Sequence, residues 1–129
     1  MKKCVILGIV FAFALKVFSE PIEVDSIESL EEILQQQNKL MLFEMYADWC
    51  RACRILKPIL AQVSEKTQEE NVQIYRINVD RNSQISAALR VQSIPHVFFF
   101  KNGRFIYQML GVNSKEEYIA VIRNFQTAD

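Results

Sequence analysis

The chain is poor in the residues that build structural metal sites and disulfide frameworks, with three cysteines and one histidine among 129 residues. A structural zinc site takes four ligands. If Cys4 belongs to a cleaved leader, only Cys50, Cys53 and His96 remain as candidate ligands. We therefore expect no metal, and a single close pair of cysteines indicates exchange chemistry rather than a structural framework.

A surplus of positive charge is also missing, because 15 Lys and Arg residues are balanced by 15 Asp and Glu residues. Residues 1–19 contain three lysines and no acid, so the rest of the chain has 12 basic residues against 15 acidic ones. A mildly acidic surface argues against nucleic acid as a partner.

Glycine and proline are scarce, at three residues each, and no linker rich in Gly, Pro or Ser interrupts the chain. Half of the residues are hydrophobic, and the length is sufficient for one buried core. We expect one globular domain over residues 20–129.

The chain also lacks an apolar run of the roughly 20 residues that a membrane-spanning helix requires. Its N-terminal run, Cys4 to Leu15, follows Met1-Lys2-Lys3 and precedes Lys16. This pattern is typical of a secretory signal peptide over residues 1–19, with cleavage after Ser19. An uncleaved anchor that extends through Phe18 is the alternative.

What the chain does contain is a close cysteine pair, Trp49-Cys50-Arg51-Ala52-Cys53, where a strand pattern gives way to a helix pattern. Residues three apart in a helix lie on one face about one turn apart, so the two sulfurs can form and break a disulfide. The first cysteine lies at the helix N-terminus, where backbone N–H groups and the macrodipole favour thiolate over thiol. The motif therefore predicts a redox-active dithiol.

Hydrophobic periodicity predicts the secondary structure around this motif. Strands are expected at residues 21–24, 40–46, 72–80, 96–100 and 104–110, with Asn102-Gly103 as a hairpin turn. Helices are expected at residues 26–37, from 50 into the 60s, at 83–91 and from 114 onward, and Asp25 with Glu28 and Ser114 with Glu117 are typical of capping boxes. A helix between each early pair of strands implies right-handed parallel crossovers, and the hairpin adds an antiparallel edge.

These features together resemble the thioredoxin family over essentially all of residues 20–129. The likeness rests on a set of motifs in a fixed order: Tyr46-Ala47-Asp48-Trp49-Cys50-x-x-Cys53, Pro58, Asn78-Val79-Asp80, Ile94-Pro95, Lys101-Asn102-Gly103 and Gly111. The resemblance implies an α/β thioredoxin fold, with three layers, α/β/α, and a central mixed sheet in the order β-α-β-α-β-α-β-β-α. It also implies a thiol–disulfide oxidoreductase that needs no cofactor beyond a Cys50–Cys53 disulfide.

The resemblance assigns roles position by position. Cys50 resembles the nucleophile that attacks a substrate disulfide, and Cys53 resembles the cysteine that resolves the mixed disulfide. Trp49 is similar to the tryptophan that shields one side of the site. Ile94-Pro95 resembles the family's cis-proline loop, which offers backbone groups to an extended substrate segment.

Glu44 occupies the position where the family usually has a buried aspartate beneath the second cysteine. Burial should raise its pKa, which suits a carboxyl group that takes a proton from Cys53 and later returns it. Glutamate is one methylene longer than aspartate, so its reach to Cys53 stays open. The alternative is a strand-end carboxylate paired with a basic group such as Lys57.

Three further residues are candidates for modulating the site. Arg51 and Arg54 bring positive charge near Cys50 and should lower its pKa, although solvated helix surface is the alternative for both. His96 follows the proline, where thioredoxins often have Thr, and could contact substrate, perturb Cys50 or be structural.

The inter-cysteine pair Arg51-Ala52 indicates the direction of electron flow. It departs from the Gly-Pro of ordinary thioredoxins and lacks the histidine of the strongly oxidising relatives. The motif is most similar to the thioredoxin-like domain of the membrane-fed thiol reductases of the bacterial periplasm. We therefore expect an exported monomer, periplasmic or anchored facing the periplasm, that reduces or relays electrons to the disulfides of other exported proteins.

Such a protein would have protein disulfides or dithiols as substrates and a membrane or thioredoxin-type electron donor. The alternatives are a disulfide oxidase or isomerase, and a non-catalytic client-binding module. The 41 residues between Cys53 and Pro95 leave no room for the inserted helical domain of the dedicated bacterial oxidases.

Overall fold

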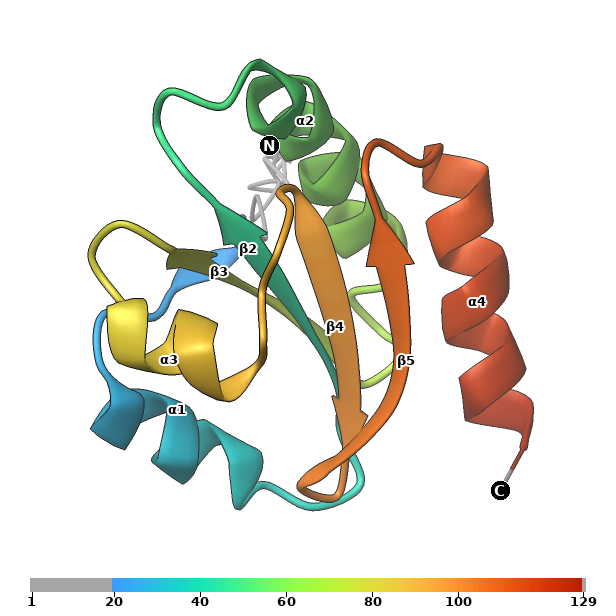
Figure 1. Cartoon of the computed structure of the whole chain (residues 1–129). Coiled ribbons are helices and arrows are strands. Elements are labelled where there is room, and N and C mark those ends of the chain that lie inside the picture. Colours follow the sequence, from blue (N-terminus) through green and yellow to red (C-terminus); the bar gives the residue numbers. More distant parts are fainter. Residues whose placement is uncertain (1–19, 129) are drawn as a thin grey trace, which may run out of the picture.

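A computed structural model describes residues 20–128 of the chain. Five strands and four helices follow one another in the expected order (Figure 1): β1 (Ile22–Glu23), α1 (Ile27–Leu34), β2 (Leu40–Tyr46), α2 (Arg51–Lys66), β3 (Val72–Asn78), α3 (Ser83–Ala88), β4 (His96–Lys101), β5 (Arg104–Leu110) and α4 (Lys115–Thr127). The predicted signal peptide, residues 1–19, lies outside the described residues. Within residues 20–128 no helix combines the length and the apolar character needed to cross a membrane.

The five strands form one mixed sheet in the order β1-β3-β2-β4-β5. β2 is its central strand, parallel to β3 and antiparallel to β4. Every residue of β2 is buried, as its nearly unbroken apolar run predicts for a strand covered on both faces. The carboxyl end of β2 leads directly into the loop that carries the cysteine pair.

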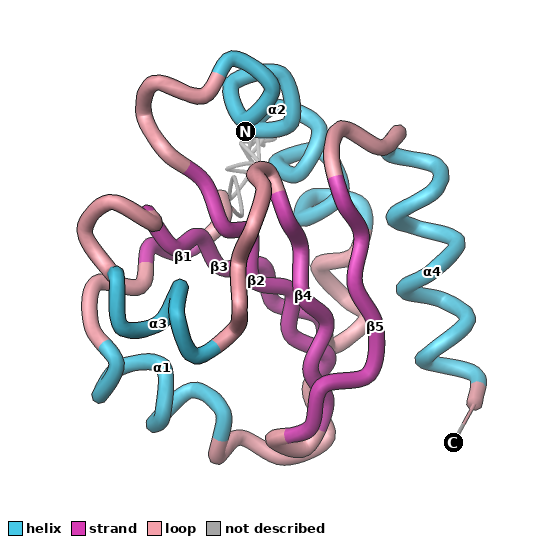
Figure 2. Tube along the Cα trace, in the orientation of Figure 1, coloured by secondary structure: helices cyan, strands magenta, loops and turns pink. Residues whose placement is uncertain are grey.

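Helices cover both faces of the sheet, with α2 and α4 on one side and α1 and α3 on the other (Figures 1 and 2). Side chains alternate along β2, so that Leu40 and Leu42 pack with α2 and α4, whereas Met41, Phe43 and Met45 pack with α1 and α3. The three-layer α/β/α architecture is therefore confirmed. By the same alternation the side chain of Glu44 faces the α2 layer, so a charged residue lies on a buried face of the sheet.

The start of α1 differs from the prediction. Ser26, not Asp25, is the N-cap residue, and its side-chain oxygen accepts a hydrogen bond from the Ser29 backbone N–H at 3.1 Å. The helix also ends at Leu34 rather than at residue 37. Leu34 is the last apolar residue of the periodic stripe, so the glutamines that follow it have no buried face to hold them in a helix.

The direction of β4 also differs from the prediction. The pattern strand–helix–strand suggested a parallel crossover around α3, but β4 runs antiparallel to its neighbour β2, and β5 runs antiparallel to β4. The antiparallel part of the sheet therefore includes both strands of the hairpin. Periodicity identifies a strand and a helix, but it does not report the direction in which the next strand enters the sheet.

Candidate active site

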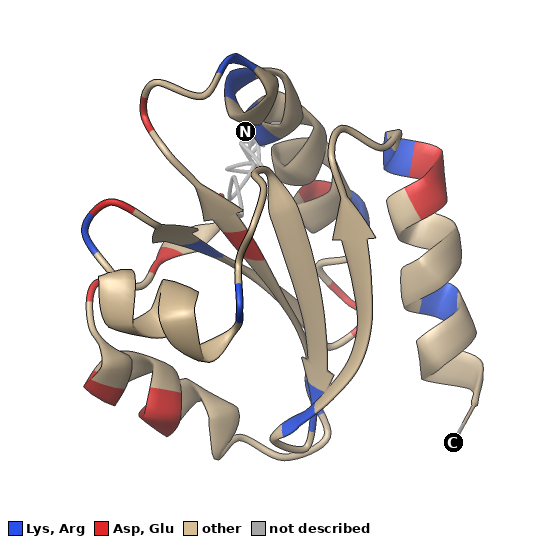
Figure 3. Ribbon diagram, viewed as in Figure 1, with Lys and Arg blue, Asp and Glu red and all other residues tan. Residues whose placement is uncertain are grey.

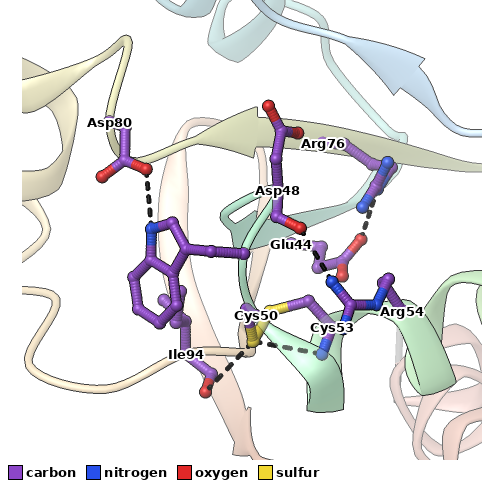
Figure 4. The surroundings of a disulfide bond; sticks show 9 residues. Glu44, Asp48, Cys50, Cys53, Arg54, Arg76, Asp80 and Ile94 are labelled. Carbon is purple, nitrogen blue, oxygen red and sulfur yellow. Dashed lines mark hydrogen bonds and ion pairs between the residues drawn. A yellow bond between two sulfur atoms is a disulfide. The ribbon is translucent and has the colours of Figure 1, made fainter.

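Cys50 and Cys53 form a disulfide across the start of α2, with their Cα atoms 5.2 Å apart. Cys50 is the N-cap residue of the helix, and its Sγ accepts a hydrogen bond from the Cys53 backbone N–H at 3.1 Å (Figure 4). This donor stabilises negative charge on the Cys50 sulfur once the disulfide is opened. The helix N-terminus predicted for Cys50 is confirmed.

The two cysteines differ in their access to solvent. Cys53 is buried, with 1% of its surface exposed, and Cys50 is 6% exposed. Cys50 borders a groove of about 360 Å³, whose other lining residues are Trp49, Val79, Ser86, Val91, Gln92, Ser93 and Ile94. A partner in this groove therefore meets the sulfur of Cys50.

The loop before β4 faces the disulfide. The Ile94–Pro95 peptide bond is cis, and the carbonyl oxygen of Ile94 lies 3.9 Å from the Sγ of Cys50 (Figure 4). The Gly111 backbone N–H donates to the carbonyl oxygen of Pro95 at 2.9 Å, which ties this loop to the end of β5. The loop and the cysteine motif, 44 residues apart in sequence, thus form opposite walls of one groove.

Trp49 forms the exposed edge of the groove. Its surface is 68% exposed, and its indole N–H donates to Oδ2 of Asp80 at 2.9 Å. Asp48 is held on the other side of the motif, because its backbone oxygen accepts from Arg54 and its carboxylate pairs with Arg81, each at 3.1 Å. These contacts fix the loop on both sides of the indole.

Glu44 is fully buried beneath this region and pairs with Arg76 of β3, the residue directly opposite it in the parallel register. The Nε of Arg76 donates to Oε2 of Glu44 at 2.6 Å, whereas Oε1 has no hydrogen-bond partner among the described residues. Burial raises the pKa of Glu44 above its ordinary value, and the hydrogen bond and charge of Arg76 oppose that shift. The partner of Glu44 is therefore Arg76; Lys57, the basic residue suggested by the sequence, acts on it only through a weaker electrostatic effect.

Arg76 is itself held in place by Tyr46. Its guanidinium carbon lies 3.6 Å from the centre of the Tyr46 ring, and the Tyr46 hydroxyl donates to Glu23 of β1 at 2.6 Å. Burial, with the hydrogen bond to Glu23, raises the pKa of Tyr46 to about 12, so its hydroxyl stays protonated at neutral pH. Arg76, Tyr46 and Glu23 form one connected chain of contacts that ends on Glu44.

A second, smaller pocket opens beside Cys53. It has a volume of about 200 Å³ and is lined by Tyr46, Ala47, Asp48, Cys53, Arg54, Lys57 and Arg76. Cys53 and the partner of Glu44 therefore border the same opening to solvent.

His96, by contrast, makes its contacts away from the cysteines. Its ring stacks on Phe98 with the centroids 3.9 Å apart, and its Nε2 lies 2.9 Å from Oε1 of Gln108. Burial lowers the pKa of His96, with the hydrogen bond to Gln108 acting in the opposite direction. These contacts match the structural alternative for this histidine. Residues 20–128 contain no group of three or more His, Cys, Asp or Glu side chains suited to hold a metal ion.

Comparison with known proteins agrees with this geometry. The family model for thioredoxin matches residues 21–124, most of the chain. A thioredoxin of Rickettsia bellii is 34% identical over 97 residues, which cover 75% of this chain and 91% of that protein. The chain belongs to the thioredoxin family. A thioredoxin-like protein of Synechocystis is 31% identical over 94 residues, covering 73% of this chain and 89% of the relative.

Solved thioredoxin structures share the fold. The structure of a mutant thioredoxin from Halobacterium salinarum aligns with a TM-score of 0.77 at 23% identity, over 87% of this chain and 96% of that one. Malassezia sympodialis thioredoxin aligns with a TM-score of 0.75 at 23% identity, over 84% and 93%. The predicted thioredoxin fold is confirmed. Family membership and the Cys50–Cys53 pair together make this chain a thiol–disulfide oxidoreductase of the thioredoxin type.

Sequence reasoning brought together most of this site but missed Arg76. The structure places Trp49, Cys50 and Ile94 around one groove, with Cys53 buried behind Cys50. Arg54 contacts the loop before the cysteines, and Arg51 is exposed beside them. Arg76 is the one basic residue in the alternating strand at residues 72–80. Its pairing with Glu44 could be predicted only from the register of β3 against β2, which the sequence does not give.

Proposed function

We propose that this thioredoxin-family protein reduces disulfides of other exported proteins, with Cys50 as nucleophile and Cys53 as resolving cysteine. The observation that carries the proposal is the asymmetry of the pair. Cys50 lies at a helix N-terminus and borders the groove, whereas Cys53 lies buried behind it. A substrate in this groove therefore meets the sulfur of Cys50, and Cys53 acts from behind it.

In the first step the Cys50 thiolate attacks one sulfur of a substrate disulfide. A bond forms between Cys50 and that sulfur, the substrate S–S bond breaks, and the other substrate sulfur leaves as a thiolate and takes up a proton. The Cys53 backbone N–H and the dipole of α2 stabilise the thiolate before attack. The substrate segment lies extended along the Ser93-Ile94 wall of the groove, where the Ile94 carbonyl oxygen can accept a backbone hydrogen bond.

In the second step Cys53 attacks the Sγ of Cys50. The Cys50–Cys53 disulfide forms, the mixed disulfide breaks, and the substrate leaves with both of its sulfurs reduced, so two electrons have passed from this protein to the substrate. Cys53 must first lose its proton, and Glu44 is the acceptor in this proposal. The Oε1 of Glu44 accepts no hydrogen bond from the described residues. Burial raises the pKa of Glu44, which brings it closer to the pKa of a thiol and so favours proton transfer from Cys53.

The pocket beside Cys53 supports this route. Because Cys53 and Arg76 both line it, solvent can reach the neighbourhood of the buried carboxylate without passing through the substrate groove. Glu44 can thus return its proton to solvent while the substrate still occupies Cys50.

Export is supported by residues 1–19, which have the pattern of a signal peptide or an uncleaved anchor. The direction of electron flow is supported by Arg51-Ala52, which lacks the histidine of the strongly oxidising relatives. In an oxidising compartment such as the periplasm, a reductase also needs a membrane or thioredoxin-type donor to reopen its disulfide.

Two cysteine variants test the proposed roles. We expect Cys50→Ser to abolish the reduction of insulin disulfides, whereas Cys53→Ser should attack once and remain trapped as a mixed disulfide that is visible by mass spectrometry. Insulin reduction that survives Cys50→Ser would contradict the mechanism. A trapped complex on Cys53 in the Cys50→Ser variant would reverse the two roles.

A further inference from the structure

The groove that receives the substrate carries no charged side chain within the described part of the chain. Its eight lining residues there include no Asp, Glu, Lys or Arg. Discrimination between charged substrates must therefore come from the residues that surround the groove.

Exposed cations lie on two sides of this groove. Arg51, Arg54 and Lys57 occupy the first two turns of α2, and the helix carries no acid before Glu65. Arg51 directly follows the lining residue Cys50. Across the groove, the exposed Arg90 directly precedes the lining residue Val91.

Two carboxylates also lie beside the groove, because Asp48 precedes the lining residue Trp49 and Asp80 follows the lining residue Val79. Asp48 pairs with Arg81 at 3.1 Å, and Asp80 accepts the hydrogen bond of Trp49 at 2.9 Å. The stretches of α1 that Figure 3 colours as acidic lie toward the opposite end of the sheet from the start of α2. Arg81 balances the charge of Asp48, whereas Asp80 keeps its negative charge because the indole of Trp49 is neutral. The four exposed cations Arg51, Arg54, Lys57 and Arg90 outnumber this one carboxylate, so the charge around the groove is net positive.

We propose that the preferred substrate is a protein segment with Asp or Glu residues close to its disulfide-bonded cysteine. This inference rests on the proposed function, because it concerns the substrate of the same groove. Opposite charge attracts such a segment within a Debye length of Arg51 and Arg90, and like charge repels a basic one. The apolar groove binds the segment around the cysteine, and the surrounding cations select its flanks.

The test uses three single-cysteine peptides, each as a disulfide with 2-mercaptoethanol, that differ only in having Glu, Gln or Lys on both sides of the cysteine. Stopped-flow kinetics give the rate at which the reduced protein attacks each peptide. Each rate is divided by the rate with dithiothreitol, which removes the effect of the flanking charges on the disulfide itself. At low salt we expect the Glu peptide to react about 10-fold faster than the Lys peptide. At about 1 M salt, where the Debye length is about 3 Å, this ratio should approach one.

Charge reversal assigns the effect to its source. We expect Arg51→Glu/Arg90→Glu to invert the Glu-to-Lys ratio and Arg51→Glu alone to reduce it. Arg104→Glu, in the hairpin at the far end of the sheet, should leave it unchanged. The ratio is formed within each variant, so a change in the reactivity of Cys50 cancels. A wild-type ratio of one or less, or a ratio that survives the double reversal, would overturn the inference. Failure of the proposed function is distinguishable, since the Gln peptide would then not be reduced either.

Discussion

At the scale of single residues, the pair of Glu44 and Arg76 links stability to chemistry. Burial favours the neutral carboxylic acid, and the Arg76 guanidinium 2.6 Å away favours the carboxylate. Glu23 on β1 raises the pKa of Glu44 and Lys57 on α2 lowers it, both by smaller electrostatic effects. The state of Glu44 therefore depends chiefly on burial and on Arg76.

We expect Arg76→Met to raise the pKa of Glu44 further, because it removes the main opposition to burial. When a carboxyl group has a higher pKa in the folded protein, stability is lost as the pH rises from the unfolded value to the folded one. In the variant this loss should extend to higher pH, and the variant should be about 3 kcal/mol less stable at neutral pH. Urea unfolding across this pH range measures both effects.

A matched control is Arg123→Met, which removes an exposed ion pair with Glu70. We expect this change to cost at most about 1 kcal/mol and to leave the pH dependence as it is in the wild type. If Arg76→Met and the wild type show the same pH dependence, the opposition between burial and Arg76 does not set the pKa of Glu44.

Glu44→Gln tests the proton-accepting role. Glutamine keeps the size and can accept the Arg76 hydrogen bond, but it cannot take a proton from Cys53. We expect the second step to slow about 100-fold while the attack of Cys50 on the substrate stays near its wild-type rate. Rapid acid quenching should then show an accumulated mixed disulfide, and its absence would assign Glu44 a structural role alone.

At the scale of elements, the hairpin between β4 and β5 was predictable and its environment was not. Asn102 and Gly103 both have positive φ, of 52° and 73°, as the Asn-Gly pair predicts for a two-residue turn. The structure adds a tertiary constraint, because a Cβ introduced at Gly103 would lie only 3.2 Å from the carbonyl oxygen of Leu34 at the end of α1. The positive φ of Gly103 therefore favours glycine, and a side chain at this position would also have to displace the carbonyl group of Leu34 slightly.

Replacement of Gly103 by Ala should therefore destabilise the protein more than the same change at Gly111. Gly111 has a similar φ of 71°, but a Cβ there would meet nothing within 4 Å among the described residues. We expect about 1–2 kcal/mol of conformational cost at each position, with an additional cost at Gly103 for displacing Leu34. If both variants lose the same free energy of unfolding in urea, the carbonyl group of Leu34 adds no cost to the substitution at Gly103.

Local patterns located the elements but not every boundary. The capping box of Ser114 with Glu117 is present as predicted, whereas the N-cap residue of α1 is Ser26 and not the predicted Asp25. Both Asp25 and Ser26 are good N-cap residues, so local propensity does not choose between them. With Ser26 as the N-cap residue, Ile27 and Leu30 both pack in the core on the α1 side of the sheet.

At the scale of the whole molecule, the sequence predicted the layers better than the contacts between distant strands. The apolar run at residues 40–46 predicted a strand covered on both faces, the motif at Cys50 predicted the position of the dithiol, and the resemblance to thioredoxins implied the three-layer architecture. The Glu44–Arg76 pair and the direction of β4 depend on pairing between segments far apart in the chain. Neither a period nor a motif within one segment contains that information.

If this dithiol donates electrons to its substrates, the reduction potential of the Cys50–Cys53 pair must be low. The purified protein is equilibrated with thiol–disulfide buffers of known potential, and the fraction of the disulfide form is measured by thiol alkylation. We predict a potential near or below the value of about −270 mV that is typical of thioredoxin. A potential near about −120 mV, typical of a strong disulfide oxidant, would contradict the claim.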